Sequence, residues 1–112
     1  MSIRQASIRQ AGLNEIYTLW RAQPAEHIWI DVRQPEEWAE GTIPGVKRIQ
    51  LGQLPQQLDT LDKSKTYVCI CRSGGRSGRA CQAMAAAGFE KLINFDGGML
   101  AWYQAGYPTE SP

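Results

Sequence analysis

Residues 66–88 read Thr66-Tyr-Val-Cys-Ile-Cys71-Arg-Ser-Gly-Gly-Arg76-Ser-Gly-Arg79-Ala-Cys-Gln-Ala-Met-Ala-Ala-Ala-Gly88. This order predicts an apolar strand, then a Gly-rich turn, then an Ala-rich helix that ends at Gly88. Gly74 and Gly75 allow positive φ angles, so that successive N–H groups of the turn can face one concavity. The helix adds its own unpaired N–H groups and the positive end of its dipole. We therefore predict an anion-binding turn directly after the strand.

A thiolate at the mouth of such a turn would be stabilised by it, and Cys71 is the last residue of the strand. A free cysteine has a pKa of about 8.5, which falls to roughly 3.5–7.5 at a helix N-terminus near arginines. Arg72, Arg76 and Arg79 follow Cys71 closely, with no acid among them. We interpret Cys71 as an activated nucleophile; the alternative is a buried strand residue beside a plain connector.

The rest of the chain alternates between apolar runs and helical patterns. We expect an edge strand at residues 6–9 and strands at 28–33, 46–50, 66–71 and 91–95. Helices are expected on the apolar spacing of residues 13–20, after Pro35, on the leucines of residues 51–61, and after Gly98. Strands that alternate with helices predict an α/β fold with a mainly parallel sheet.

The totals are those of one ordinary domain. The chain has 112 residues, 43% hydrophobic and 21% charged, with a formal net charge of +1, and this balance indicates neither nucleic acid nor an anionic membrane as a partner. No signal core is present, and no run approaches the ~20 apolar residues of a membrane span. We expect a structured core over residues 6–107 and a loose tail at 108–112.

Three cysteines, Cys69, Cys71 and Cys81, are too few and too close for a zinc pattern with one histidine, and an odd number closes no disulfide framework. A reduced, cytoplasmic setting follows. Cys69 shares a strand face with Cys71, but such positions lie about 7 Å apart, too far for a disulfide. We interpret Cys69 as core. Cys81 is interpreted as a small buried residue, with a resolving thiol for oxidised Cys71 as the alternative.

The segment Cys71-Arg-Ser-Gly-Gly-Arg-Ser77 resembles the active-site loop of rhodaneses, the thiosulfate and related sulfurtransferases. The resemblance spans nearly the whole chain. It includes Ile30-Asp31-Val32-Arg33 with Pro35-Glu36-Glu37-Trp38, then Gly41-Thr42-Ile43-Pro44-Gly45-Val46, then Phe95-Asp96-Gly97-Gly98 with Trp102. One position departs from the family, which usually has His where this chain has Thr42. That position is regarded as structural, so the chemistry is unaffected.

The resemblance implies a three-layer fold, a mainly parallel five-stranded sheet with helices on both faces. It also implies that Cys71 takes the outer sulfur of thiosulfate, becomes a persulfide, and passes the sulfur to cyanide or a thiol, without cofactor or metal. The substrate-binding residues would be Arg72, Ser73, Gly74, Gly75, Arg76 and Ser77. Asp31 and Arg33 would support the site; for Asp31, a structural hydrogen bond or an ion pair with an arginine is favoured over a general-acid or loop-orienting role.

Two enzyme alternatives are weaker. His27 precedes its strand and should lie at the sheet edge opposite Cys71, so a Cys–His dyad is not expected. Tyrosine-phosphatase-like loops place five residues between Cys and Arg, whereas four separate Cys71 from Arg76, which favours a terminal sulfur over a phosphate. A persulfide carrier that serves a protein acceptor remains open, as do a small phosphatase or arsenate reductase and a non-catalytic binding module.

Overall fold

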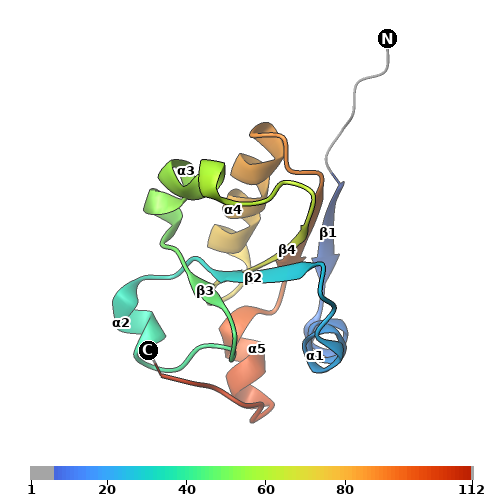
Figure 1. Cartoon of the computed structure of the whole chain (residues 1–112). Coiled ribbons are helices and arrows are strands. Elements are labelled where there is room, and N and C mark those ends of the chain that lie inside the picture. The colour runs from blue at the N-terminus through green and yellow to red at the C-terminus, as the bar shows by residue number, and fades with distance from the viewer. Residues whose placement is uncertain (1–6, 112) are drawn as a thin grey trace.

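A computed structural model describes residues 7–111 (Figure 1). Five strands form one sheet in the order β1-β5-β4-β2-β3, with every adjacent pair parallel. Their bounds are Ser7–Ala11 for β1, His27–Asp31 for β2, Lys47–Arg48 for β3, Thr66–Ile70 for β4 and Lys91–Phe95 for β5. The predicted α/β fold is confirmed. The expected edge strand begins at Ser7 and extends to Ala11, while Ala6 lies outside the described residues.

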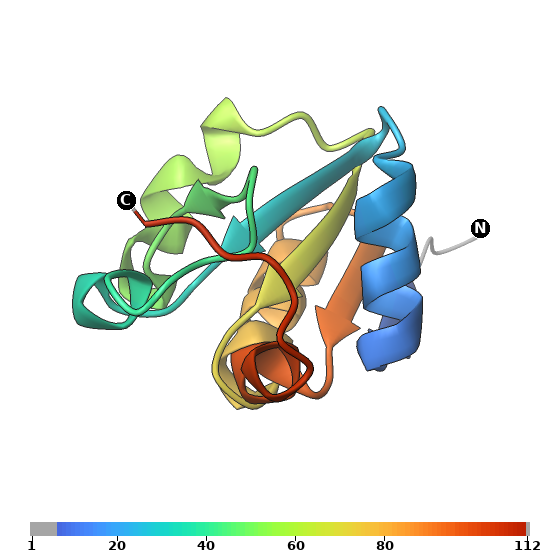
Figure 2. The same ribbon diagram turned by 90° about the horizontal axis from the view of Figure 1, so that it is seen from below.

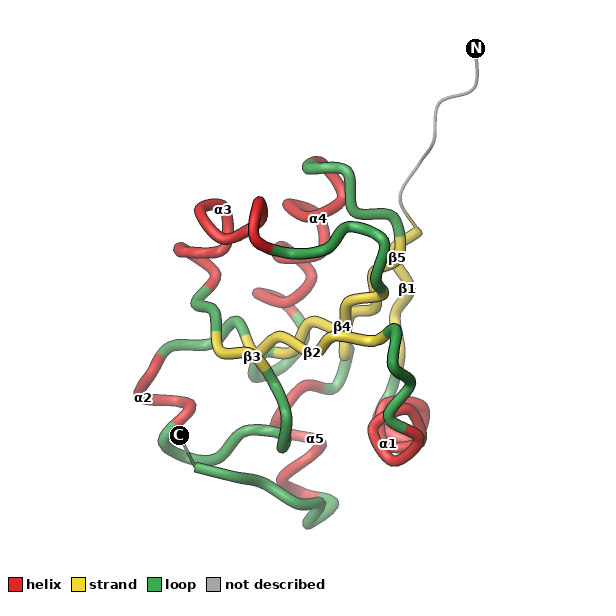
Figure 3. Tube along the Cα trace, in the orientation of Figure 1, coloured by secondary structure: helices red, strands yellow, loops and turns green. Residues whose placement is uncertain are grey.

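Helices cover both faces of this sheet. The helices α1 (Leu13–Ala22) and α5 (Gly98–Gln104) lie on one side, and α3 (Leu54–Gln57) and α4 (Gly75–Ala86) on the other (Figure 3). The short helix α2 (Pro35–Trp38) follows β2 (Figure 1). In the view from below, α1 and α5 both lie on the near side of the sheet (Figure 2). None of the helices in the described range combines the length and apolar character needed to cross a membrane.

The central strand β4 is buried on both faces, which explains its apolar composition. Tyr67 and Cys69 point into the core cluster under α4, whereas Val68 and Ile70 point into the cluster under α1 and α5. Because side chains alternate along a strand, Cys71 continues the row of Cys69 and belongs to the same cluster. The core assignment of Cys69 is confirmed.

Two expected elements are shorter than the sequence pattern suggested. The helix expected on residues 51–61 is broken into a 3-10 turn at Leu51–Gln53, α3, and a second 3-10 turn at Leu58–Thr60. Pro55 is the physical reason for the first of these breaks, because it has no N–H and sits in the first turn of α3, where a helix can begin but not continue from the preceding turn. The strand expected at 46–50 pairs with β2 only over Lys47–Arg48.

The C-terminal segment is attached to the domain over residues 108–111. Thr42 and Glu110 exchange two backbone hydrogen bonds of 2.8 Å each, and Trp102 donates from its ring nitrogen to the Pro108 carbonyl at 2.7 Å. The Glu110 carboxylate also accepts from the Gly45 N–H at 3.0 Å. The expectation of a loose tail is therefore wrong for these residues; Pro112 lies outside the described range.

Candidate functional site

The turn that joins β4 to α4 surrounds the sulfur atom of Cys71. The Gly74 N–H donates to Sγ at 3.1 Å, and the Ser77 hydroxyl lies 3.3 Å from the same atom. Cys71 is only 1% exposed. The chain folds this way because Cys71 is the first residue after a buried strand, and its side chain continues the inward-facing row of that strand.

The loop makes the thiolate of Cys71 easier to form. Burial raises the pKa of the thiol, but hydrogen bonds from the Ser77 hydroxyl and from the backbone N–H groups of Ser77, Ser73 and Gly74 outweigh it. The pKa of Cys71 is therefore lowered below its usual value. Hydrogen bonds to the charged form have this effect because they favour ionisation. Neutral loop donors thus favour the nucleophilic form.

Gly74 makes the turn possible. Its φ is +98°, and a Cβ atom at this position would lie 2.5 Å from the carbonyl oxygen of Asp96. Any other residue would therefore meet both backbone strain and a steric clash. Gly75, which was expected to share this role, has no positive φ and begins α4 with open space where a Cβ would stand. One left-handed residue is sufficient to turn the strand into the helix.

The start of α5 supports the loop from the neighbouring strand connection. The N–H groups of Met99 and Leu100 donate to the carbonyls of Cys71 at 2.9 Å and Arg72 at 3.1 Å. Gly98, with φ +60°, packs so closely against the Arg72 backbone that a Cβ would overlap it. The sequence shows the Gly97-Gly98 pair but gives no local sign of its contact with the Cys71 loop.

The buried side chain of Asn94 also supports the Cys71 loop, and the sequence analysis did not predict it. Asn94, on β5, accepts a hydrogen bond from the Ser77 hydroxyl at 2.5 Å and donates to the Gly74 carbonyl at 3.1 Å and the Gln10 side chain at 2.8 Å. It is only 4% exposed. The available signal was an amide side chain inside the otherwise apolar strand Lys91–Phe95.

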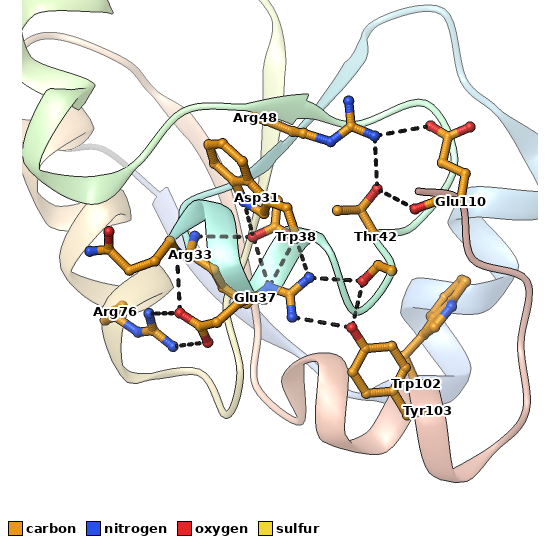
Figure 4. A network of polar contacts seen from close by, with 12 residues as sticks. Asp31, Arg33, Glu37, Trp38, Thr42, Arg48, Arg76, Trp102, Tyr103 and Glu110 are labelled. Atoms are coloured by element: carbon orange, nitrogen blue, oxygen red, sulfur yellow. Dashed lines mark hydrogen bonds and ion pairs between the residues drawn. The ribbon is translucent and has the colours of Figure 1, made fainter. Parts of the chain in front are cut away.

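One of the three loop arginines, Arg76, is paired with an acid from another part of the chain. Glu37 of α2 binds Arg76 through both oxygens, at 2.6 and 2.8 Å (Figure 4). The hydrogen bond from Arg76 lowers the pKa of Glu37 to about 2. Glu37 precedes Arg76 by 39 residues, which is why the local stretch gave no sign of it. Arg72 and Arg79 are exposed.

Asp31 and Arg33 form a buried ion pair that contacts Trp38 of α2. Arg33 donates to both carboxylate oxygens, at 2.9–3.1 Å, and to the Gly41 carbonyl at 3.0 Å (Figure 4). It also donates to the Tyr103 hydroxyl at 3.2 Å, and the Trp38 ring nitrogen donates to Asp31 at 3.3 Å. The favoured ion pair is confirmed. This network fixes the segment that carries Glu37.

His27 lies away from the Cys71 thiol, and Cys81 is engaged with Cys69. His27 begins β2 and pairs with Thr66, at the opposite end of β4 from Cys71, so the Cys–His dyad is excluded as expected. Cys81 is fully buried and interacts with Cys69, and this contact together with burial raises the pKa of Cys69. The small-residue interpretation of Cys81 is confirmed.

Thr42 occupies the position at which a His was expected from the sequence resemblance. It helps to hold the C-terminal segment against the domain. Its hydroxyl accepts from Arg48 at 3.3 Å and donates to the Glu110 carbonyl at 3.3 Å (Figure 4). The side chain is fully buried. The departure thus falls on a structural contact.

Comparison with known proteins gives one consistent result. The family model described as the rhodanese-like domain matches residues 13–105 of this chain. The chain is 52% identical over 73 residues to a Bacillus subtilis protein named "Putative sulfurtransferase YtwF", covering 65% of this chain and 70% of that protein. It is 32% identical to a "Sulfurtransferase" of Allochromatium vinosum, over 81% of this chain and 85% of the other. A rhodanese-like domain protein from Staphylococcus aureus superposes with a TM-score of 0.82 at 28% identity, covering 93% of this chain and 98% of the other.

Proposed function

The chain belongs to the rhodanese-like sulfurtransferase family, and on that premise we propose that Cys71 accepts the outer sulfur of thiosulfate and carries it as a persulfide to a nucleophilic acceptor. The observation that carries the proposal is the position of Sγ, which lies 3.1 Å from the Gly74 nitrogen and 3.3 Å from the Ser77 hydroxyl. These donors favour a thiolate, which is the form that attacks sulfur.

In the first step the Cys71 thiolate attacks the outer sulfur of thiosulfate. A new S–S bond forms to Sγ, the S–S bond of thiosulfate breaks, and sulfite leaves with the electron pair of that bond. The negative charge then lies on the outer sulfur of the persulfide. Loop N–H groups from Arg72 to Ser77 are the proposed donors to this charge, because preorganised donors in a water-poor site stabilise developing charge without reorganising.

In the second step cyanide or a thiolate attacks the outer sulfur. The S–S bond of the persulfide breaks, its electron pair returns to Sγ, and thiocyanate or a new persulfide departs. Each step exchanges one S–S bond with a nucleophile, so the cycle needs no cofactor and no metal. A protein thiol could take the place of the small acceptor, and Arg72, which is exposed next to Cys71, would then meet that partner.

The loop favours a sulfur donor over a phosphate ester. Cys71 is 1% exposed, so a donor that offers one terminal sulfur atom can approach more closely than a tetrahedral phosphate on a protein side chain. Phosphate recognition uses the two terminal nitrogens of an arginine, but both terminal nitrogens of Arg76 already donate to the Glu37 carboxylate.

Intact mass measurement tests the proposal. The protein is incubated with thiosulfate, and the mass should rise by one sulfur that maps to Cys71 and disappears on addition of cyanide. Cys71→Ala should show no adduct, whereas Cys81→Ala, a matched removal of a thiol in the same cluster, should keep it. Absence of the adduct in the reduced wild-type protein would refute thiosulfate as the donor.

The same preparation separates the enzyme from a carrier of sulfur for another protein. An enzyme that uses small acceptors should release sulfur to cyanide or a low-molecular-weight thiol in repeated turnovers. A dedicated carrier should form the same adduct but release its sulfur slowly to cyanide and to the small thiol, because fast release would require contact with a protein acceptor. Steady turnover with small acceptors would exclude the dedicated carrier.

A further inference from the structure

The Ser77 hydroxyl has one proton and two acceptors within reach. Its oxygen lies 2.5 Å from Oδ1 of Asn94 and 3.3 Å from Sγ of Cys71. A serine hydroxyl donates one hydrogen bond only. All three residues are buried, with exposed fractions of 0% for Ser77, 1% for Cys71 and 4% for Asn94, so water is not at hand to replace a lost partner. The Ser77 proton can therefore bind only one acceptor at a time, either Oδ1 of Asn94 or Sγ of Cys71.

The orientation of the Asn94 amide follows from its other contacts. Its second polar atom lies 3.1 Å from the Gly74 carbonyl oxygen. A backbone carbonyl can only accept, so the NH₂ end of the amide faces Gly74. The same end lies 2.8 Å from Oε1 of Gln10. Oδ1 is consequently the atom that faces Ser77, and it can only accept.

We propose that Asn94 tunes Cys71 by competing with the thiolate for the proton of Ser77. While Cys71 is a thiol, its S–H can donate to the Ser77 oxygen, which donates in turn to Asn94, and each buried group has a partner. When Cys71 ionises, the Ser77 proton turns to sulfur, and Oδ1 of Asn94 loses its donor inside the protein. A buried acceptor without a donor is unfavourable, so Asn94 opposes full stabilisation of the thiolate.

The competition has a chemical use that rests on the proposed function. A thiolate that is stabilised too well attacks more slowly, because nucleophilicity falls as the pKa falls. In the persulfide the charge moves outward by one S–S bond, about 2.05 Å. The Ser77 proton can then return to Asn94, whose recovered hydrogen bond favours the persulfide over the resting thiolate. Asn94 is thus a positioning residue that acts through Ser77.

Other charged and titratable groups near the sulfur are separate from this pair. Arg76 of α4, bound to Glu37 of α2, interacts electrostatically with Cys71. The thiol of Cys69 lies on the same face of β4 as Cys71. Arg72 is the exposed neighbour in the loop. None of them is altered by a substitution at Asn94, so they form a constant background.

The test is the pH dependence of Cys71 alkylation by iodoacetamide, followed by mass mapping of the modified cysteine. Asn94→Leu removes the acceptor at similar volume, and the pKa of Cys71 should fall by about half to one unit, the size of one neutral hydrogen bond. The plateau rate at high pH should fall about two- to threefold for a full unit. Ser77→Ala should raise the pKa instead.

The double variant Ser77→Ala/Asn94→Leu distinguishes competition from a disturbed loop. Without the shared proton, adding Asn94→Leu should leave the pKa of Ser77→Ala unchanged. A shift that persists in this background, or a rise in the pKa of Asn94→Leu alone, would overturn the inference. Gln10→Ala is the control, because it removes the hydrogen bond from the Asn94 amide nitrogen to Gln10 and leaves Oδ1 of Asn94 in place. Asn94→Ser repeats the test if Asn94→Leu does not fold.

This experiment uses no sulfur donor, so it is independent of the sulfur-transfer cycle. If the thiol pKa responds as expected but thiosulfate leaves no adduct, the proposed donor fails and the competition stands. If thiosulfate forms the adduct and the pKa does not respond to Asn94, the inference fails and the proposed function stands.

Discussion

Replacing Glu37 with Gln removes the carboxylate that holds Arg76. The pKa of Glu37 lies at about 2 rather than at its ordinary 4.5, and two and a half units correspond to roughly 3.4 kcal/mol. The paired side chains are 31% and 22% exposed, so solvent screens part of this value. We expect Glu37→Gln to lower the free energy of unfolding at pH 7 by about 1–2 kcal/mol.

The pH dependence follows from the sign of the shift. A carboxylate with a lowered pKa in the folded state stabilises the protein above its ordinary pKa, and this contribution is lost as the pH falls toward 2. Roughly three-fifths of it should be gone at pH 3. Urea unfolding of wild type and Glu37→Gln should therefore show a clear difference at pH 7 and a much smaller one at pH 3.

The same substitution should strengthen donor binding under the proposed function. With Glu37 neutral, the Arg76 guanidinium is available to an anion, and one partly exposed charge contact is worth up to about 1 kcal/mol. The KM for thiosulfate should fall by up to about fivefold with kcat nearly unchanged. Glu36→Gln is the matched control, because it removes the same charge from α2 at an exposed position.

Two results would refute this account of Glu37. An equal stability difference at pH 3 and pH 7 would mean that the ion pair is not its source. A rise in KM for Glu37→Gln, in parallel with Arg76→Gln, would mean that Arg76 serves by bracing the loop through Glu37 rather than by meeting the donor.

The other predictions concern the backbone and the buried ion pair. Gly74→Ala should destabilise the domain by at least about 1–2 kcal/mol and raise the pKa of Cys71, because its Cβ would meet the Asp96 carbonyl at positive φ. Gly75→Ala, with open space at its Cβ, should be neutral or stabilise α4 by up to about 1 kcal/mol; equal urea midpoints for the two variants would contradict this. Arg33→Met should cost about 3–5 kcal/mol, because Asp31 stays buried without its partner, and a urea-measured loss under about 1 kcal/mol would disprove it.

Local patterns were enough for the sulfur site because its main parts are adjacent in the chain. Strand β4, the turn and α4 are one continuous segment, and the donors to Sγ come from Gly74 and Ser77, within six residues of Cys71. Alternation along β4 correctly placed Cys69 in the core. The parallel sheet followed from alternating strands and helices, since parallel neighbours need a crossover between them.

Partners brought in by the fold were not predictable from these patterns. Glu37 meets Arg76 across 39 residues, and Asn94 meets Ser77 across 17. The tail was misjudged for the same reason, since Glu110 pairs with Thr42, which is far from it in sequence. The helix expected on residues 51–61 is interrupted near its start for a local reason instead: Pro55 permits a helix to start but not to continue through it, and the leucine spacing does not reveal this.

The distribution of charge around Cys71 bears on which chemistry the loop can perform. Arg33 is occupied by Asp31 and Arg76 by Glu37, so the groups that reach Sγ are neutral N–H and hydroxyl donors. A phosphate ester is normally bound by a bidentate arginine whose terminal nitrogens are free, and both terminal nitrogens of Arg76 are bound to Glu37. A thiolate or persulfide carries one charge on a single sulfur atom, which a few neutral donors can hold. Under the proposed function, the neutral donors of the loop suit charge on the Cys71 sulfur, and Glu37 holds Arg76 away from a bound anion.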